Sequence, residues 1–319
     1  MNELARLSVI AAAWFCAWPT PVRGHPGELR QLVVVISSAR EEYESASREL
    51  MITLADNSRN LIVEKRLYQP GAAGEKSFWE DISSKKPSLI ITVGTPSSRS
   101  AITNIKNIPL VCSMILGELR PEGTADKSAI EYAGVSLSIP YLTQLKILSD
   151  ALPTVRRIGL LSSPATANKF ESVRATAQSM GLRLVDCVIS SDREISAVLE
   201  RLLPQIEVLW VPPDDRIYSG EALRYILQQS YSKSVAVMAF SRQMAEAGAA
   251  LSIGFDYEDI GRQTAELVLE KLSAAGAGLQ IVPPRSVVLY INEPVAAGLG
   301  LHIPRNVLEN AVILGKEQR

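Results

Sequence analysis

The sequence predicts an α/β protein made of two doubly wound parallel-sheet lobes joined by a multi-strand hinge. Three observations support this prediction. The chain has 319 residues, 47% hydrophobic and 21% charged, which is enough for two hydrophobic cores. Short runs of β-branched residues alternate with longer amphipathic segments, as in βαβ units. The alternation starts again half-way along the chain, and one sheet holding all these strands would be unusually wide.

The N-terminal segment departs from this pattern and is typical of a signal peptide. Residues 7–18 form an apolar run that follows a basic residue and is too short to span a bilayer. Prolines end the run, and Val22 and Gly24 are small enough for the positions before a cleavage site. We therefore expect residues 1–24 to be a signal peptide removed during export, with the mature chain starting near His25.

Buried strands and amphipathic helices alternate in the first predicted lobe, residues 25–136. Its opening strand, QLVVVIS, is apolar without alternation, which indicates burial on both faces of a parallel sheet. The helix that follows has apolar residues at helical spacing. The predicted strands are 31–37, 61–68, 88–93, 108–113 and 132–135, and the predicted helices are 43–56 and 77–84.

The same order of elements returns in the second predicted lobe, residues 137–253. Each strand is again short and apolar, and each helix has an apolar face. The predicted strands are 157–161, 183–188, 208–211 and 235–240, and the predicted helices are 141–152, 167–180, 193–203 and 220–230.

The last part of the chain argues against two independent domains. Residues 254–283 are interpreted as a return to the first lobe, and residues 284–319 as a return to the second. The chain then crosses between the lobes near Val135, Ile253 and Pro283. Three crossings form a hinge that allows rigid-body closure and limits twist. The elements predicted here are a strand at 250–254, a helix at 257–272 and a strand at 286–290.

Composition excludes several classes of function. The 33 basic and 34 acidic residues give a net charge of −1 and no basic patch for nucleic acid or an anionic membrane. The only histidines, His25 and His302, lie at opposite ends of the mature chain, too few for a zinc site or a Ser-His-Asp arrangement. Cys112 and Cys187 lie in apolar strands and imply no disulfide framework. The GTPSSR segment lacks the lysine of a P-loop, so we expect no cofactor.

Several segments together resemble the ABC transporter substrate-binding proteins of the uncharacterised tryptophan/tyrosine-type group. The resemblance covers nearly the whole mature chain, and the order and spacing of the segments are more specific than any one of them. It implies the type I periplasmic binding fold and a monomeric receptor that carries a small solute to an ABC permease. The segments are ITVGTPSSRSA, AGVSLSIPYLTQLKILSDALP, IGLLSSPATAN, LWVPPDDRI, FDYEDIGRQTAELV and LYINEPVAAGLGLHIP.

The chain also departs from the pattern of that group at the predicted cleft. Leu137 stands where such proteins commonly have an acidic residue. The loop that usually reads Pro-Thr-Asp-Asn is Pro212-Pro213-Asp214-Asp215, and the Tyr-Asn-Pro loop is Ser-Ser-Pro. The ligand therefore need not be an aromatic amino acid.

The candidate ligand-binding residues lie where predicted strands end. Ligands of open parallel sheets bind beyond the carboxyl ends of the strands, where helix N-termini offer backbone N–H groups. The predicted ligand-binding residues are Ser37, Ser38, Gly94, Thr95, Pro96, Ser97, Ser113, Met114 and Ser136 in the first lobe, Ser162, Ser163, Asn168, Asp214, Asp215, Ser241 and Arg242 in the second, and Asp256 at the hinge.

Each of these residues also has a local interpretation. Serine and threonine at strand ends commonly cap the next helix, and Thr95 could do so. Asp214 and Asp215 form either a turn or cap, or a site for an ammonium or hydroxyl groups. Asp256 is placed to cap a helix, and Arg242 either clamps a carboxylate or faces water.

Two functions follow from this organisation. The first is an exported solute-binding protein of an ABC-type uptake system, which closes on a small polar, amino-acid-like ligand without changing it. The alternative is a periplasmic sensory receptor that regulates a membrane histidine kinase or similar partner. An enzyme using Asp214 and Asp215 is disfavoured because neighbouring side chains on an extended segment point to opposite faces. A DNA-binding repressor would need a helix-turn-helix where the signal-like segment stands.

Overall fold

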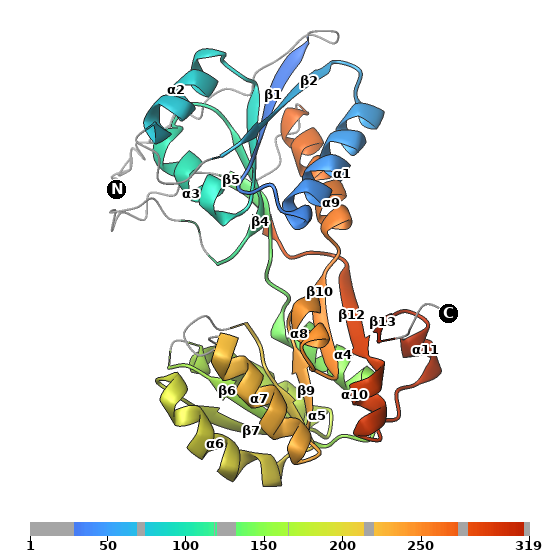
Figure 1. Ribbon diagram of the computed structural model, residues 1–319. Helices are drawn as coiled ribbons and strands as arrows, with labels where there is room; N and C mark the ends of the chain where they lie inside the picture. Colours follow the sequence, from blue (N-terminus) through green and yellow to red (C-terminus); the bar gives the residue numbers. More distant parts are fainter. Residues whose placement is uncertain are drawn as a thin grey trace, which may run out of the picture.

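The protein consists of two α/β lobes, one above the other in the orientation of Figure 1. One sheet has six strands and the other has seven. Within the described residues, no helix is both long and apolar enough to cross a membrane. This computed structural model describes residues 29–68, 74–117, 119, 132–164, 166–213, 220–273 and 280–315.

The first sheet is parallel throughout and has the order β11-β5-β4-β3-β1-β2. In strand β1, Leu32 and Val34 pack with helices α1 and α9, whereas Val33 packs with α2 and α3. Burial on both faces explains why this strand has no polar alternation. The elements are β1 (Arg30–Ile36), α1 (Glu41–Asn57), β2 (Leu61–Leu67), α2 (Glu75–Ser84), β3 (Leu89–Val93), α3 (Thr95–Asn104), β4 (Leu110–Ile115), β5 (Tyr132–Ser136), α9 (Tyr257–Leu272) and β11 (Ile281–Val282).

The second sheet has the order β13-β12-β10-β9-β8-β6-β7, and only the β10–β12 pair is antiparallel. Leu160 of β6 packs with α4 and α5, and Leu161 packs with α6 and α7. The strands are β6 (Arg157–Ser162), β7 (Arg183–Val188), β8 (Val208–Trp210), β9 (Ala236–Ala239), β10 (Leu251–Phe255), β12 (Val287–Asn292) and β13 (Val312–Leu314). The helices are α4 (Tyr141–Ala151), α5 (Glu171–Ser179), α6 (Ile195–Leu202), α7 (Gly220–Ser232), α8 (Arg242–Glu246), α10 (Glu293–Gly298) and α11 (Arg305–Leu308), with short 3-10 helices η1 (Ala167–Phe170), η2 (Asp192–Glu194) and η3 (Leu203–Gln205).

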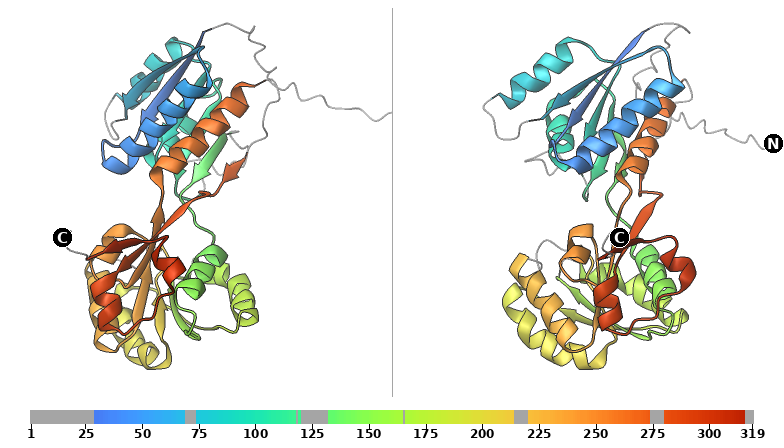
Figure 2. Two further views of the ribbon diagram at one scale, coloured as in Figure 1. Left: turned by 90° about the vertical axis from the view of Figure 1, so that its right-hand side faces the viewer. Right: turned by 45° about the vertical axis from the view of Figure 1, so that its right-hand side comes forward.

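The chain passes between the lobes three times (Figure 2). Residues 137–140 join β5 to α4, Asp256 joins β10 to α9, and residues 283–286 join β11 to β12. Helix α9 returns to the first lobe and packs along α1. The predicted fold, two doubly wound lobes of mainly parallel strands with a multi-strand hinge, is confirmed.

Some elements differ from the sequence-based prediction. The GTPS segment, expected as a loop, already belongs to α3 from Thr95 onward. The helix expected at 167–180 is a 3-10 turn followed by α5. Helices α8, α10 and α11 and strands β11 and β13 were not predicted, because segments of two to six residues are too short to show a periodic pattern.

Candidate ligand-binding cleft

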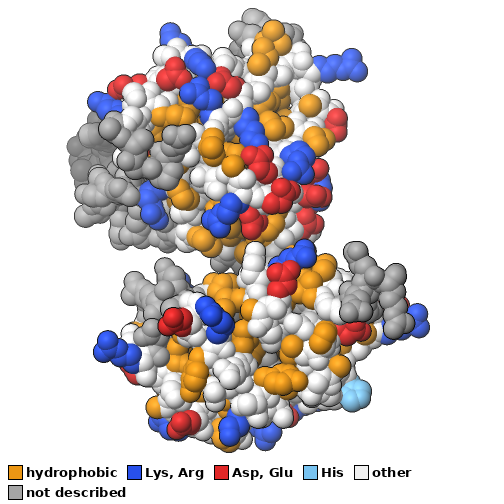
Figure 3. Space-filling view, viewed as in Figure 1, with side chains coloured by type: hydrophobic (Ala, Val, Ile, Leu, Met, Phe, Trp, Pro, Cys, Tyr) orange, Lys and Arg blue, Asp and Glu red, His pale blue; other side chains and the backbone are white. Residues whose placement is uncertain are grey.

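The carboxyl ends of the parallel strands in the two lobes face each other. Strand β5 leaves the first lobe at its carboxyl end and leads into α4 of the second. Strand β10 leaves the second lobe at its carboxyl end and leads into α9 of the first. Strand β4 runs parallel to β5 and strand β9 runs parallel to β10, so their carboxyl ends lie on the same side of each lobe. The loops that follow these strands therefore border the hollow between the lobes seen in Figure 3.

Each sheet also has a point where the strand order reverses. In the first lobe the order β5-β4-β3-β1-β2 reverses between β1 and β3, and in the second the order β10-β9-β8-β6-β7 reverses between β6 and β8. The loops that follow two such strands diverge to opposite faces of the sheet and leave a crevice between them, which is where open α/β sheets bind ligands. The topology therefore selects two opposed crevices.

The first-lobe crevice is formed by the loops after β1 and β3. Ser37 Oγ accepts a hydrogen bond from the Ser97 backbone N–H (3.0 Å) and donates one to Ser97 Oγ (2.8 Å). Ser37 thus takes the capping role that the N-cap residue of α3, Gly94, has no side chain to fill. Gly94 has φ +107°, and a Cβ there would lie 2.5 Å from Tyr43 Cε1. The glycine lets Tyr43 pack against the start of α3.

Other first-lobe candidates are engaged within the lobe. Thr95 does not cap α3, as the sequence had suggested, because it lies inside the helix and its Oγ1 accepts a hydrogen bond from the Leu116 N–H (2.9 Å). Ser113 is buried, with its Oγ 2.7 Å from Thr264 Oγ1 of α9. Met114 is also buried, with φ +56° at an irregularity in β4. Of the remaining candidates, Ser38 and Ser136 are half-buried and Pro96 is exposed.

Three aromatic rings pack together beside the reversal point of the second lobe. Tyr141 begins α4, Phe170 follows β6, and Trp210 ends β8, so three separate segments supply the group. The Tyr141 and Phe170 ring centroids are 4.4 Å apart, and both rings lie within about 6 Å of the Trp210 ring. Trp210 Nε1 donates to Gln144 Oε1 (3.1 Å), which fixes the indole. Phe170 and Trp210 are buried, and Tyr141 is only half-buried.

The second-lobe candidates predicted from the sequence have mixed positions. Ser162 and Ser163 are buried at the end of β6, and Asn168 is exposed in η1. Ser241 Oγ caps α8 by accepting from the Met244 N–H (3.3 Å). Arg242 is exposed and pairs with Glu246 (2.8 Å), which raises the pKa of the arginine. Asp214 and Asp215 lie outside the described residues.

The hinge side of the cleft carries an ion-pair network. Asp256 caps α9 by accepting from the Asp259 N–H (2.9 Å). Arg285, in the third crossing, donates to both carboxylate oxygens of Asp259 (3.0 and 3.1 Å) and to Glu266 (2.7 Å). Burial alone would raise the pKa of Asp259, but the hydrogen bonds and charge of Arg285 hold it below its usual value. The third crossing is therefore anchored to α9.

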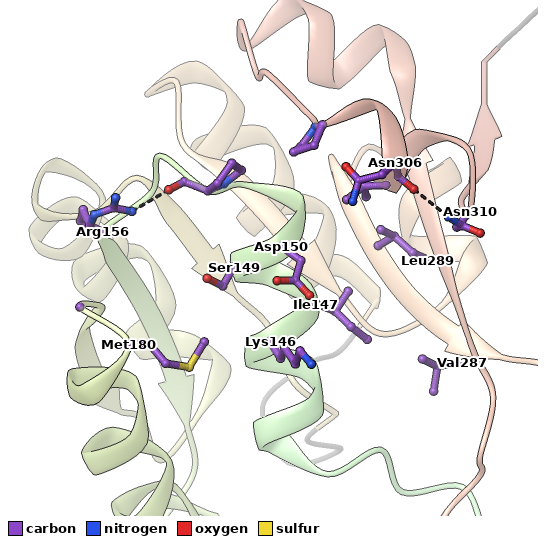
Figure 4. Close-up of a pocket in the computed structure, with 14 residues that line it drawn as sticks. Lys146, Ile147, Ser149, Asp150, Arg156, Met180, Val287, Leu289, Asn306 and Asn310 are labelled. Atoms are coloured by element: carbon purple, nitrogen blue, oxygen red, sulfur yellow. Dashed lines mark hydrogen bonds between the residues drawn. The ribbon is translucent and has the colours of Figure 1, made fainter.

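A second concavity lies on the flank of the second lobe, between α4, β12 and α11 (Figure 4). Its volume is about 1060 Å³. It is lined by charged side chains of α4, including Lys146 and Asp150, by Leu289 of β12 and by Asn306 of α11. None of the ligand-binding residues predicted from the sequence lines this groove.

Comparison with known families agrees with this architecture. Residues 76–313 match the family model described as ABC transporter substrate binding protein, which is well over half of the chain. The chain belongs to this family. Proteins of the ABC transporter substrate-binding family bind a solute, are exported and serve a transporter or a receptor.

Relatives of this family member include one curated protein with a stated ligand. The chain is 25% identical over 226 residues to the tyrosine-binding protein of Clostridioides difficile (strain R20291). The aligned part is 68% of this chain and 64% of that protein, so slightly less than two thirds of the relative's length is spanned.

Solved structures share the bilobed fold. The ligand-free, open structure of a substrate-binding protein with adhesive properties from Clostridium difficile has a TM-score of 0.73 at 19% identity, covering 91% of this chain and 100% of that one. A Streptococcus pneumoniae ABC domain in complex with L-Trp has a TM-score of 0.58 at 18% identity, covering 90% and 99%. At these identities the likeness concerns the fold.

Sequence reasoning missed the aromatic group of this binding protein. Tyr141, Phe170 and Trp210 are separated by up to 69 positions and only the sheet order brings them together. The available signal was their place beside strand ends: Trp210 ends an apolar strand, and Tyr141 directly follows a crossing.

Proposed function

We propose that this protein is an exported receptor that closes its two lobes on an amino-acid-like solute bearing an aromatic ring and passes it to an ABC permease. One observation carries the proposal: the hydroxyl groups of Ser37 and Ser38 lie at the reversal point of one lobe, and a half-buried tyrosine ring packed on two buried rings lies beside the reversal point of the other. A ligand with a polar end and a flat apolar end matches both surfaces.

The aromatic cluster of Tyr141, Phe170 and Trp210 supports a flat ligand because its rings are held in place. Phe170 and Trp210 form a buried base, and the half-buried Tyr141 leaves part of its ring accessible. An aromatic ligand stacked on Tyr141 would gain about 0.5 to 1.5 kcal/mol beyond simple area burial. The tyrosine-binding relative and the L-Trp complex of a structural neighbour point in the same direction.

The polar crevice supports an amino-acid-like end group. Ser37 and Ser38 lie at the end of β1, and α3 starts directly beside them with the Thr95 N–H in its first turn. Hydroxyl groups and the positive end of a helix are suited to a carboxylate. Three crossing segments let both crevices approach one another as rigid bodies. Ligand contacts made only in the closed form would shift the population toward closure.

Titration calorimetry tests the proposal. Protein produced from residue 25 is titrated with L-tryptophan, L-tyrosine, L-leucine and ribose, and the ligands are recovered and analysed by mass spectrometry. We expect the aromatic amino acids to bind more tightly than leucine, ribose not to bind, and every ligand to be recovered unchanged. Small-angle scattering should show a smaller radius of gyration with bound ligand. Binding of ribose in preference to the amino acids, or chemical conversion of the ligand, would contradict the proposal.

A further inference from the structure

Arg40 lies at the entrance to the first-lobe crevice. Strand β1 ends at Ile36, and Arg40 is the N-cap residue of α1, so the residue belongs to the loop at the β1/β3 reversal point. Its backbone N–H donates to Ser38 Oγ (3.3 Å), which ties the loop together. The side chain is exposed. Sequence reasoning did not select Arg40, because it stands three residues beyond the predicted buried strand.

The charge of Arg40 is not neutralised by its neighbours. Among the described residues no carboxylate lies within ion-pair distance of Arg40. Of the acidic side chains next to it on α1, Glu41 pairs with Arg48 (3.2 Å) and Glu44 pairs with Lys65, and Glu42 forms no ion pair with Arg40. An exposed guanidinium that its own helix does not pair is available to an anionic ligand group.

The guanidinium is positioned by an aromatic ring that is itself fixed. Arg40 Cζ lies 5.9 Å from the centre of the Tyr43 ring, a cation–π distance. Tyr43 in turn packs against Gly94 at the start of α3. The fixed Tyr43 ring therefore holds the guanidinium beside the loops after β1 and β3.

Arg242, the other arginine considered for this role, is less suited to it. Its Nε already donates to Glu246 (2.8 Å), so the charge of this arginine is already balanced by a neighbouring carboxylate. No such competition exists at Arg40 among the residues that the structure describes.

We infer that Arg40 recognises the carboxylate of the ligand, with its guanidinium held over the Tyr43 ring at the β1/β3 reversal point. The inference rests on the proposed function and deepens it by assigning the residue and the charge. The solute is then an acid: its carboxylate is bound by two parallel N–H donors, and an amide or ester of the same solute lacks the negative charge that they require.

The test uses matched ligand pairs with wild-type protein and Arg40→Gln. The probes are L-tryptophan with L-tryptophanamide, and L-tyrosine with L-tyrosinamide, each titrated by calorimetry. Loss of a charge-assisted hydrogen-bonded pair predicts about a tenfold to hundredfold rise in Kd for the acids and little change for the amides. The preference for acid over amide should therefore vanish in Arg40→Gln. Arg40→Lys keeps the positive charge but lacks the planar guanidinium, and it should restore part of the preference for acid over amide.

Arg59→Gln is the matched control. Arg59 is also exposed and has no ion pair among the described residues, but it precedes β2 and lies at the opposite end of the sheet from the cleft. This variant should bind like wild type. If wild type prefers the acids and Arg40→Gln keeps the same preference, the assignment of Arg40 is wrong while the proposed function stands. If wild type binds neither amino acid, the proposed function fails and the assignment fails with it.

Discussion

Replacing Gly94 with alanine should strongly destabilise the first lobe, because two separate costs add. The residue has φ +107° and ψ 150°, a backbone conformation that residues other than glycine adopt only at about 1 to 3 kcal/mol. The new Cβ would also lie 2.5 Å from Ser37 Oγ and 2.5 Å from Tyr43 Cε1. Overpacking of this kind costs about 1 to 3 kcal/mol. The expected loss is about 2 to 6 kcal/mol in the free energy of unfolding.

Tryptophan fluorescence can follow this loss in one lobe at a time. In the described residues Trp79 is buried in the first lobe and Trp210 in the second. A chain produced from residue 25 omits the two remaining tryptophans. In a Trp210→Phe background, urea denaturation monitored by fluorescence therefore reports on the first lobe. The Gly94→Ala change should shift its midpoint to lower urea concentration with an unchanged slope.

Gly248→Ala separates the two costs. Gly248 also has a positive φ, +121°, but no atom lies within 4 Å of an added Cβ. Its replacement should therefore cost only the free energy of the strained backbone conformation. In a Trp79→Phe background, the fluorescence of Trp210 reports this loss of stability in the second lobe. If Gly94→Ala costs no more than Gly248→Ala, then Tyr43 and Ser37 do not pack against Gly94 as described, and the argument for a fixed first-lobe crevice is refuted.

Three further predictions follow from individual contacts. Tyr141→Ala should weaken binding of an aromatic amino acid by about threefold to tenfold in calorimetry. Tyr225→Ala, on α7 of the same lobe, should leave the affinity unchanged. Equal effects of the two changes would exclude a role of the aromatic cluster in ligand binding. Burial raises the pKa of Cys112 to about 11, so its thiol is protonated and unreactive in the folded protein at pH 8. In a Cys187→Ser background the folded protein should therefore not react with a disulfide reagent at pH 8 until urea is added. Because the folded pKa of Asp259 is lowered, its ion pair with Arg285 stabilises the protein above the unfolded pKa of about 4 and is lost as pH falls through the folded value. Arg285→Gln should thus reduce the stability difference between pH 7 and pH 3 measured by urea denaturation, and an unchanged difference would rule out this anchor.

Most of the fold could be predicted because burial leaves a local pattern. A strand covered on both faces must be apolar throughout, as 31–37 is, and a helix on a sheet must be apolar along one stripe. The elements that were missed, such as β11 (Ile281–Val282), are stabilised by their place beside another strand and show no pattern of their own. The helical start at Thr95 was missed because its capping group, Ser37, comes from another loop.

The candidate site could be predicted only in part. The rule that ligands bind beyond the carboxyl ends of parallel strands selects loops, and the loops after β1 and β3 do meet at Ser37 and Ser97. The rule says nothing about which way each side chain points, and so Ser113, selected in the same way, is turned inward to Thr264. Whether the selected residues contact a ligand stays a prediction.

The sequence by itself determined the class of the protein: its lengths of strand and helix, the repeat of the pattern, the three crossings and the scarcity of metal or catalytic ligands. The tertiary structure alone decided the strand order, and with it the two reversal points where residues distant in the chain meet. Hydrophobic periodicity reports whether a segment is buried, which is a local property. Which strands become neighbours depends on packing over the whole sheet, and that choice brought Tyr43 against Gly94 in the first lobe and gathered the three rings in the second.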